Sequence, residues 1–462
     1  MTAVRPAAGT GTPDGPSTPD GPGVSHLAAE PVRRFATLTR PGPMEQTLVV
    51  LTTFVLVHQT PNVWFRTRAD FLIDSSNPVA VVLALGLVGL AFARVAGSVD
   101  QLIAIIRGEP AVFLFAGLTF ASTFWSADPA ETVQKSVPFV AVTAYGAYLV
   151  MRFSLNQIMK LLSLMFVISG VLNLVTVVAL PVYGVDTAGQ FSGIFPEKNM
   201  LGYVAALALP TLLLAGKSWR RWRWLFWPGA VLQLGLLVGS QSKTMLLAAL
   251  GPTCLIAVYQ LFRSRKTLRG AVIISLFGTA VFTVAFATAN IAVLARWLDK
   301  DITLTGRVPL WENLIPIATH RPLLGSGYGA VFNGYFSPIH EVWIQNQWNP
   351  THAHNAILQI TLEIGLVGAV LFLVTYLRGV TRAIKIVAIV PGPAGLWPLV
   401  FLTTTLLVSI TESGVNSDDL GWLMFVVTIL SISLHLRYRN QLGLSNDLQD
   451  AIDANAHHRV LR

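Results

Sequence analysis

Long apolar runs alternate with short polar segments along most of the 462 residues of this chain. A helix needs about 20 apolar residues to cross the ~30 Å hydrocarbon layer of a bilayer, and runs close to that length recur throughout the sequence. The pattern predicts about twelve transmembrane helices and therefore an all-α polytopic membrane protein. The predicted spans are residues 46–64, 77–94, 110–126, 137–151, 158–183, 200–216, 223–240, 244–262, 270–296, 355–377, 394–411 and 419–436.

One long polar segment, residues 297–354, separates the ninth and tenth predicted spans. It contains Arg307, His352 and His354, so we expect this loop to be catalytic. No separate soluble domain is predicted. By composition the chain divides into a disordered cytoplasmic tail that lacks the apolar run of a signal peptide (1–43), a membrane domain (44–438) and a cytoplasmic C-terminal segment (439–462).

The composition excludes an ordinary soluble globular protein. Hydrophobic residues make up 53% of the chain and charged residues 12%, and the mean hydropathy is +0.60. Cys254 is the single cysteine, and because it lies within a predicted span we expect it to be buried. Neither a disulfide nor a cysteine-based zinc cluster is therefore available to hold the outer loop.

Lysine and arginine residues are concentrated in alternate loops, and basic loops stay on the cytoplasmic side of a membrane. This bias predicts that both termini are cytoplasmic and that the loop 297–354 faces outward. The net charge of +9 follows from the same bias, so no nucleic-acid partner is expected. We interpret the basic and aromatic segment 217–224 as an interfacial anchor on anionic lipid.

Five polar motifs fall on the predicted outer side. They are residues 191–199, 240–244, 305–307, 352–355 and 411–419. Each alone has a structural explanation, such as a helix start or a solvated turn, but together on one face they favour an outer active site. The glycine-rich segment 325–329 is interpreted as a tight turn, because it lacks the strand context of a nucleotide-binding loop.

Basic groups at the outer membrane face suit a lipid-linked diphosphate, which an arginine fork binds strongly with assistance from lysine. Transfer of a sugar from such a donor also needs a base near the acceptor hydroxyl, and histidine is the natural base near neutral pH. Arg307, Lys198, Lys243 and His354 form one set of residues that fits this chemistry.

The tenth predicted span begins with a polar stripe. Asn355, Gln359 and Glu363 recur every four residues and so share one face of a helix. An ionisable group inside a span faces either a cavity or a partner helix, and both alternatives stay open for Glu363. His352 and His354 could bind a metal, but we find no further ligands at a recognised spacing, so no metal is expected.

The motifs resemble one family when they are taken together. They are FSGIFPEKN (191–199), SQSK (240–243), TGR (305–307) with Trp311, HRPLLGSG (320–327), and HAHN (352–355) followed by Gln359 and Glu363. In order, spacing and membrane placement they resemble the O-antigen ligase and polymerase superfamily, over residues 185–377. Within it, the chain looks most like bacterial exopolysaccharide repeat-unit polymerases.

The resemblance implies a membrane glycosyltransferase of the all-helical GT-C type that inverts the sugar configuration and needs neither metal nor cofactor. Its donor and acceptor would be glycans linked to undecaprenyl diphosphate at the outer face of the bacterial inner membrane. The product would be an exopolysaccharide or O-antigen-like polymer. A chain-length regulator and export proteins are the implied protein partners.

Residue by residue, the family's diphosphate-binding arginine falls on Arg307 and its histidine falls on His354, with His352 as a competing base. A second basic position falls on Lys243, where ligases often have arginine, so its role here is open. The remaining expected substrate-binding residues are Glu197, Lys198, Asn199, Asn355, Gln359 and Glu363.

Two other functions remain open at this point. A ligase would move a finished glycan to a lipid or protein acceptor. A flippase or other transporter would carry the lipid-linked oligosaccharide across the membrane, although such proteins usually place polar sites at the midplane between internal repeats.

Overall fold

The computed structural model describes residues 41–58, 86, 89, 98–261, 307–332, 339–346, 350–390, 392–410, 412–413 and 420–442. All of them belong to one compact unit, Thr39–Arg462. Within these residues the regular structure is helical, apart from one isolated antiparallel bridge between Val185 and Phe191. The expectation of an all-α chain is therefore confirmed for the part that the structure describes.

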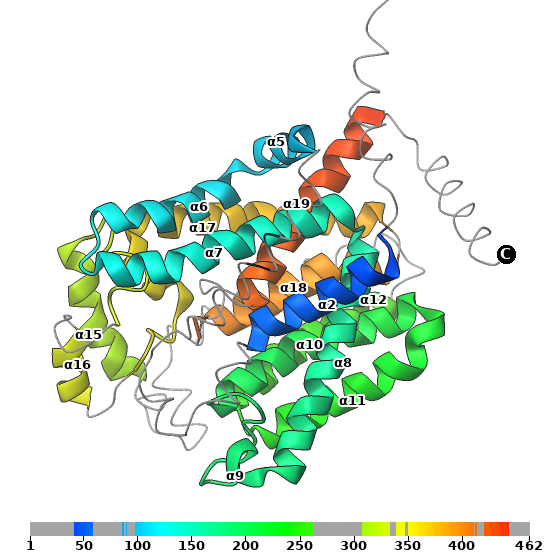
Figure 1. The fold of residues 1–462 in the computed structure, drawn as a ribbon, viewed down its shortest axis with the longest axis horizontal. Coiled ribbons are helices and arrows are strands. Elements are labelled where there is room, and N and C mark those ends of the chain that lie inside the picture. Colours follow the sequence, from blue (N-terminus) through cyan, green and yellow to red (C-terminus); the bar gives the residue numbers. More distant parts are fainter. Residues whose placement is uncertain are drawn as a thin grey trace, which may run out of the picture. The chain divides into compact units, whose positions relative to one another are not determined.

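Figure 1 shows the arrangement of the helices. In chain order they are α2 (Pro43–His58), α5 (Val99–Gly108), α6 (Pro110–Ala121), η2 (Ser122–Phe124), α7 (Pro129–Arg152), α8 (Leu155–Ala179), α9 (Pro181–Gly184), α10 (Lys198–Ser218), η3 (Arg220–Trp222), α11 (Arg223–Gly239), α12 (Lys243–Leu261), α15 (Arg307–His320), α16 (Ile339–Asn346), α17 (Ala356–Ile389), α18 (Pro393–Ser409) and α19 (Leu420–Leu442).

Five of these helices, α8, α10, α12, α17 and α19, are long and apolar enough to cross a membrane. A sixth candidate is the pair α5 and α6, which are bent by 94° at a short break. Among the shorter helices, α2 and α18 are also apolar. The predicted total of about twelve spans stays a prediction, because 270–296 and nearly all of 77–94 lie outside the described residues.

One helix was not predicted, and one expectation from the sequence needs correction. The short helix α5 was missed, because its ten residues are too few for a span and mix polar with apolar side chains. Cys254 is exposed rather than buried. On α12 the buried face includes Ala248, Pro252 and Leu255, and Cys254 lies off that face.

The polar motifs meet because several helices begin or end at the same level. Asn199, at the start of α10, accepts a hydrogen bond through Oδ1 from the hydroxyl of Ser242 (2.9 Å), which directly precedes α12. Trp397, near the start of α18, donates from Nε1 to Oγ1 of Thr211 (3.1 Å) in the second half of α10. Because α18 packs along α10, it runs antiparallel and its end returns to the level of Asn199.

The start of α17 is fixed at the same place. Asn355 caps α17 by accepting a hydrogen bond through Oδ1 from the backbone N–H of Leu358 (2.9 Å). Its side-chain amide also donates to the carbonyl of Ile410 (3.2 Å), just beyond the end of α18. We call the region formed by the starts of α10, α12, α15 and α17 and the end of α18 the site end of the helices.

Helix α17 is interrupted near its start. At Gly365 the backbone has a φ of 72° and a ψ of −174°, so the helix stops and restarts. A Cβ atom at this position would collide with the carbonyl oxygen of Leu323, which lies in an inserted loop, 321–329. Glycine is required here because it tolerates positive φ and this close approach.

The inserted loop supplies hydrogen bonds that the broken helix lacks. The N–H groups of Ser326 and Gly327 donate to the carbonyls of Leu362 (2.9 Å) and Glu363 (2.8 Å) before the break. After it, Leu366 donates its N–H to the carbonyl of Pro322 (2.8 Å). The segment 325–329 turns tightly, as predicted, with positive φ at three glycines.

Candidate active site

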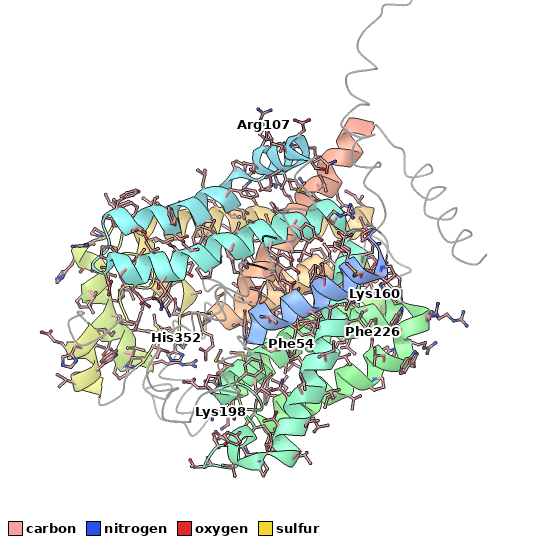
Figure 2. All side chains as sticks on the ribbon, in the orientation of Figure 1. Phe54, Arg107, Lys160, Lys198, Phe226 and His352 are labelled. Carbon is pink, nitrogen blue, oxygen red and sulfur yellow. The ribbon has the colours of Figure 1, made fainter. Side chains whose placement is uncertain are left out.

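A carboxylate, a guanidinium and two imidazoles meet at the site end. Oε1 of Glu412 accepts a hydrogen bond from Nη2 of Arg307 (2.6 Å). Its Oε2 accepts from Nε2 of His352 (3.2 Å) and from Nδ1 of His354 (3.0 Å). The four side chains come from the start of α15, the segment before α17 and the segment after α18. Figure 1 labels these three helices, and Figure 2 labels His352.

The backbone between the two histidines is clamped from both sides. Ala353 is fully buried. Its N–H donates to Oε1 of Gln359 (2.6 Å), and its carbonyl accepts from Nε1 of Trp311 on α15 (2.8 Å). His354 takes a φ of 49°, in the left-handed region that non-glycine residues seldom occupy. The clamp therefore holds a strained backbone that turns both imidazoles toward Glu412.

Burial and charge set the protonation states of this cluster. Burial alone raises the pKa of the Glu412 carboxyl, but the hydrogen bonds from His352 and His354, together with the charge of Arg307, outweigh it. The pKa of Glu412 therefore lies well below its usual range, and the carboxylate is ionised at neutral pH. Burial lowers the pKa of His354 below 6.5, and the hydrogen bond to Glu412 offsets this only in part. His354 is accordingly neutral near pH 7.

The hydrogen-bond partners also assign the tautomers. An ionised carboxylate only accepts hydrogen bonds, so the proton of neutral His354 is on Nδ1 and the basic lone pair is on Nε2. For His352 the same logic places a proton on Nε2, and its Nδ1 lies within hydrogen-bond distance of the hydroxyl of Thr351 (3.1 Å). The carboxylate thus orients His354 as a base, in the way that a catalytic triad orients its imidazole.

His352, His354 and Glu412 could also hold a metal ion, since their ligand atoms lie within 4.8 Å of one another. Two imidazoles and a carboxylate are a known zinc ligand set. Two features oppose this use. Arg307 brings a positive charge to within 2.6 Å of the carboxylate, and both imidazoles already point at a single oxygen of Glu412 rather than at a common empty point.

The structure brings the lysines predicted for substrate binding to the site end. Lys198 and Lys243 are the first residues of α10 and α12, and Asn199 links the two helix starts. Figure 2 shows Lys198 and His352 toward the same end of the helices. The hydrogen-bonded cluster around Glu412 does not include either lysine. Glu197, directly before α10, is exposed and makes no side-chain cap.

The polar stripe of α17 lies inside the protein. Gln359 and Glu363 are each 5% exposed. Nε2 of Gln359 donates to Oε1 of Glu363 (2.8 Å), which also accepts from the backbone N–H of Gly329 (3.1 Å). The sequence left open whether Glu363 faces a cavity or a partner helix. Its described hydrogen bonds are instead to its own helix, through Gln359, and to the inserted loop, through Gly329.

Glu412 is the residue of the cluster that the sequence did not single out. It lies in the polar motif 411–419, which was predicted to face outward but was given no role. A single acidic residue after an apolar helix usually just faces solvent at the helix end. A functional role for Glu412 becomes visible only in the fold, which brings it to Arg307. A carboxylate that ends an outward-facing span opposite a His-x-His motif is the signal that could have found it.

Comparison with known proteins agrees with this picture. Residues 228–373 match the family model described as O-antigen ligase. The resemblance to the O-antigen ligase and polymerase superfamily is confirmed. The matched part of this O-antigen ligase-like chain includes Lys243, Arg307, His352 and His354, whereas Glu412 lies beyond it.

Two relatives have names that concern polysaccharides. The chain is 28% identical over 280 residues to the exopolysaccharide production protein ExoQ of Rhizobium meliloti (strain 1021), which is 56% of this chain and 62% of ExoQ. It is 34% identical over 83 residues to a Rickettsia felis protein described as a candidate polysaccharide ligase, which is 17% of this chain and 20% of that protein. The chain thus covers less than two thirds of either relative. Residues 228–373 are thus similar to an O-antigen ligase domain, in a chain with five described helices that are long and apolar enough to cross a membrane.

Proposed function

We propose that this protein joins undecaprenyl-diphosphate-linked oligosaccharide repeat units into an exopolysaccharide or O-antigen-like glycan. The observation that carries the proposal is the contact of ionised Glu412 with both His354 and Arg307 at the site end. Sugar transfer from a diphosphate donor needs a base and a cation close together, and this cluster supplies both. The similarity to an exopolysaccharide production protein supports polymer formation as the outcome.

The reaction follows from the tautomer of His354. An acceptor hydroxyl oxygen attacks the anomeric carbon of the donor from the face opposite the diphosphate, and its proton passes to Nε2 of His354. The bond between the anomeric carbon and the diphosphate oxygen breaks, its electron pair leaves with the diphosphate, and the configuration inverts. Glu412 stabilises the imidazolium that forms. A base in this position contributes roughly 10²- to 10⁴-fold to the rate.

Arg307 is proposed to receive the diphosphate. A guanidinium has five N–H donors in a planar fork, and the bond to Glu412 engages only Nη2. Lys198 and Lys243 add positive charge at the starts of α10 and α12. Helix N-termini carry a partial positive charge, and α15 and α17 begin in the same region. The site end therefore suits an anionic leaving group without a metal.

The topology proposed with this function follows the charge bias of the sequence. Both termini are cytoplasmic, the site end faces outward from the bacterial inner membrane, and the full chain has about twelve spans in a GT-C-like arrangement. A chain-length regulator and export proteins are its proposed partners, because a polymer made at this face has to be limited in length and moved onward.

A ligase is the second candidate, and the family description O-antigen ligase favours it. A ligase would use the same base and cation but would transfer a finished glycan to a different acceptor. A flippase receives less support, because the polar cluster lies where helices start and end rather than in the middle of the described helices.

Deletion of the gene and analysis of lipid-linked intermediates separates these functions. A strain without the polymerase should accumulate single lipid-linked repeat units that an impermeant reagent reaches from outside. Loss of a ligase should instead leave long lipid-linked polymer, and loss of a flippase should leave single units that are inaccessible from outside. Complementation with the wild-type chain should restore polymer, and complementation with His354→Ala should not.

A further inference from the structure

A chain of hydrogen bonds connects the break in α17 to the two histidines. Gly329, in the inserted loop, donates its N–H to Glu363 (3.1 Å). Glu363 accepts from the side-chain amide of Gln359 (2.8 Å), and Gln359 accepts in turn from the N–H of Ala353 (2.6 Å). Both the oxygen and the nitrogen of the Gln359 amide are therefore engaged. This chain of bonds ends at the residue that joins His352 to His354.

The chain of bonds is buried along its length. Gln359 and Glu363 are each 5% exposed, and Ala353 is fully buried. The Gln359 amide has one further N–H and one further lone pair, but a sugar hydroxyl could reach them only by opening the packing that leaves this side chain 5% exposed. The two side chains are thus placed to hold protein groups rather than substrate.

We propose that Gln359 and Glu363 are positioning residues, which fix the backbone of Ala353 and thereby hold His352 and His354 against Glu412. This proposal rests on the proposed function and replaces the expectation that the two side chains bind substrate. The φ of 49° at His354 shows why such support is needed, because a residue in the left-handed region relaxes when its neighbours no longer hold it.

At the helix break, the inserted loop holds Glu363 in place. Glu363 lies two residues before Gly365, and its backbone carbonyl accepts from the N–H of Gly327 (2.8 Å). The inserted loop therefore holds Glu363 by its backbone, through Gly327, and by its carboxylate, through Gly329. Movement of the loop would be passed to Gln359 and then to the histidine segment.

An exchange of the two side chains tests this arrangement. In Gln359→Glu, two carboxylates face each other where an amide N–H met a carboxylate at 2.8 Å, so the link breaks through repulsion. In the double variant Gln359→Glu with Glu363→Gln, the new carboxylate at position 359 accepts from Ala353. In wild type a single oxygen of Glu363 accepts both bonds, so the new amide at position 363 has to turn its Nε2 toward that carboxylate and its Oε1 toward the N–H of Gly329. In that orientation every bond of the chain can form again.

We expect kcat to depend on whether the hydrogen bonds of positions 359 and 363 can form, and not on which of the two positions carries the charge. With the purified full chain and lipid-linked repeat units extracted from a deletion strain, at pH 8, Gln359→Glu should lower kcat roughly 10- to 100-fold, since small misplacements of catalytic groups have effects of that size. KM for the donor should change less than about threefold. The double variant should recover to within about fivefold of wild type.

A matched control separates positioning from general damage. Gln233 on α11 is 1% exposed and donates to the carbonyl of Phe166 (2.7 Å), outside this chain of bonds. Gln233→Glu places a carboxylate at an equally buried position. It should lower the melting temperature without lowering kcat of the folded fraction. A defect in Gln359→Glu that matched this control would overturn the proposal.

Chemical labelling gives a readout that does not depend on turnover. Diethyl pyrocarbonate modification of His352 and His354, followed by mass spectrometry, should be several-fold faster in Gln359→Glu and should return to the wild-type rate in the double variant. If wild type fails to elongate the extracted units but the labelling pattern holds, the proposed function fails and the positioning role stands. If the folded double variant restores neither kcat nor protection, the positioning role is wrong.

Discussion

Replacement of Glu412 by glutamine is the sharpest perturbation of the candidate active site. Three donor groups converge on this carboxylate, one on Oε1 and two on Oε2. An amide can accept on its oxygen only, and its NH₂ group would face donors on the other side. Glu412→Gln therefore keeps the shape of the side chain, removes its charge and leaves either Arg307 or the two histidines without an acceptor.

The size of the effect follows from these contacts. Hydrogen bonds to a charged group contribute about 1.5–3 kcal/mol each, and Glu412 is 8% exposed, so solvent replaces them poorly. His354 also loses the carboxylate that stabilises its imidazolium. We expect a loss of about 2–4 kcal/mol in transition-state stabilisation, or roughly 30- to 1000-fold in kcat. Stability should fall as well, by roughly 1–3 kcal/mol.

The assay is elongation of extracted lipid-linked repeat units by the purified full chain, followed by gel analysis. Glu412→Asp should be intermediate, since the charge stays but the shorter side chain reaches only part of the cluster. Glu312→Gln on α15 is the matched control, because Glu312 is exposed on the helix that begins with Arg307. Activity of Glu412→Gln within threefold of wild type would refute this reasoning.

Stability of the same variant should depend on pH with a defined sign. The pKa of Glu412 is lower in the folded chain than its usual value of 4.5. Its contribution to stability is therefore fully present above about pH 4.5 and is lost as the pH falls through the lowered pKa. The difference in melting temperature between wild type and Glu412→Gln should stay constant from pH 6 to pH 8 and narrow below about pH 4.5. A difference that widened on acidification would contradict the assigned ionisation.

Three further outcomes are expected. Arg307→Ala should lower polymer formation roughly 30- to 1000-fold, and Arg307→Lys should recover little because a lysine lacks the planar fork. Wild-type amounts of polymer from Arg307→Lys would exclude a bidentate role for Arg307. His354→Ala should abolish elongation, and His352→Ala should have a smaller effect on it. Wild-type activity should survive EDTA; loss of activity in EDTA that a divalent ion restores would make the two histidines metal ligands. Labelling of introduced cysteines needs a Cys254→Ser background, because the native thiol is exposed. In that background Thr351→Cys should react with an impermeant thiol reagent in spheroplasts and Ser154→Cys should not, and the reverse pattern would show that the topology is inverted.

The sequence predicted the helices whose apolar runs are uninterrupted. Spans expected at 200–216 and 223–240 agree closely with α10 and α11, because length and hydropathy are local properties. Helix α17 was predicted only over 355–377, and its break at Gly365 was not foreseen. The break depends on a loop that begins more than forty residues earlier, at Arg321, and such a contact leaves no local pattern.

The candidate site shows the same division. Arg307, His352 and His354 stand out as polar groups in a long loop, and the structure brings them together. Their common partner Glu412 lies more than fifty residues beyond His354 and acquires its role only when α18 runs back along α10. The burial that lowers the pKa of His354 likewise comes from packing that a linear pattern does not record.

Reconstitution tests the central claim most directly. The purified chain in liposomes is given lipid-linked repeat units extracted from the deletion strain, and the products are separated by size. The proposed polymerase should convert single units into a ladder of longer lipid-linked glycans, with no other acceptor added, and His354→Ala should leave the single units unchanged. Products that appear only after a separate lipid or protein acceptor is supplied, each carrying one transferred glycan, would contradict polymerisation and identify the chain as a ligase.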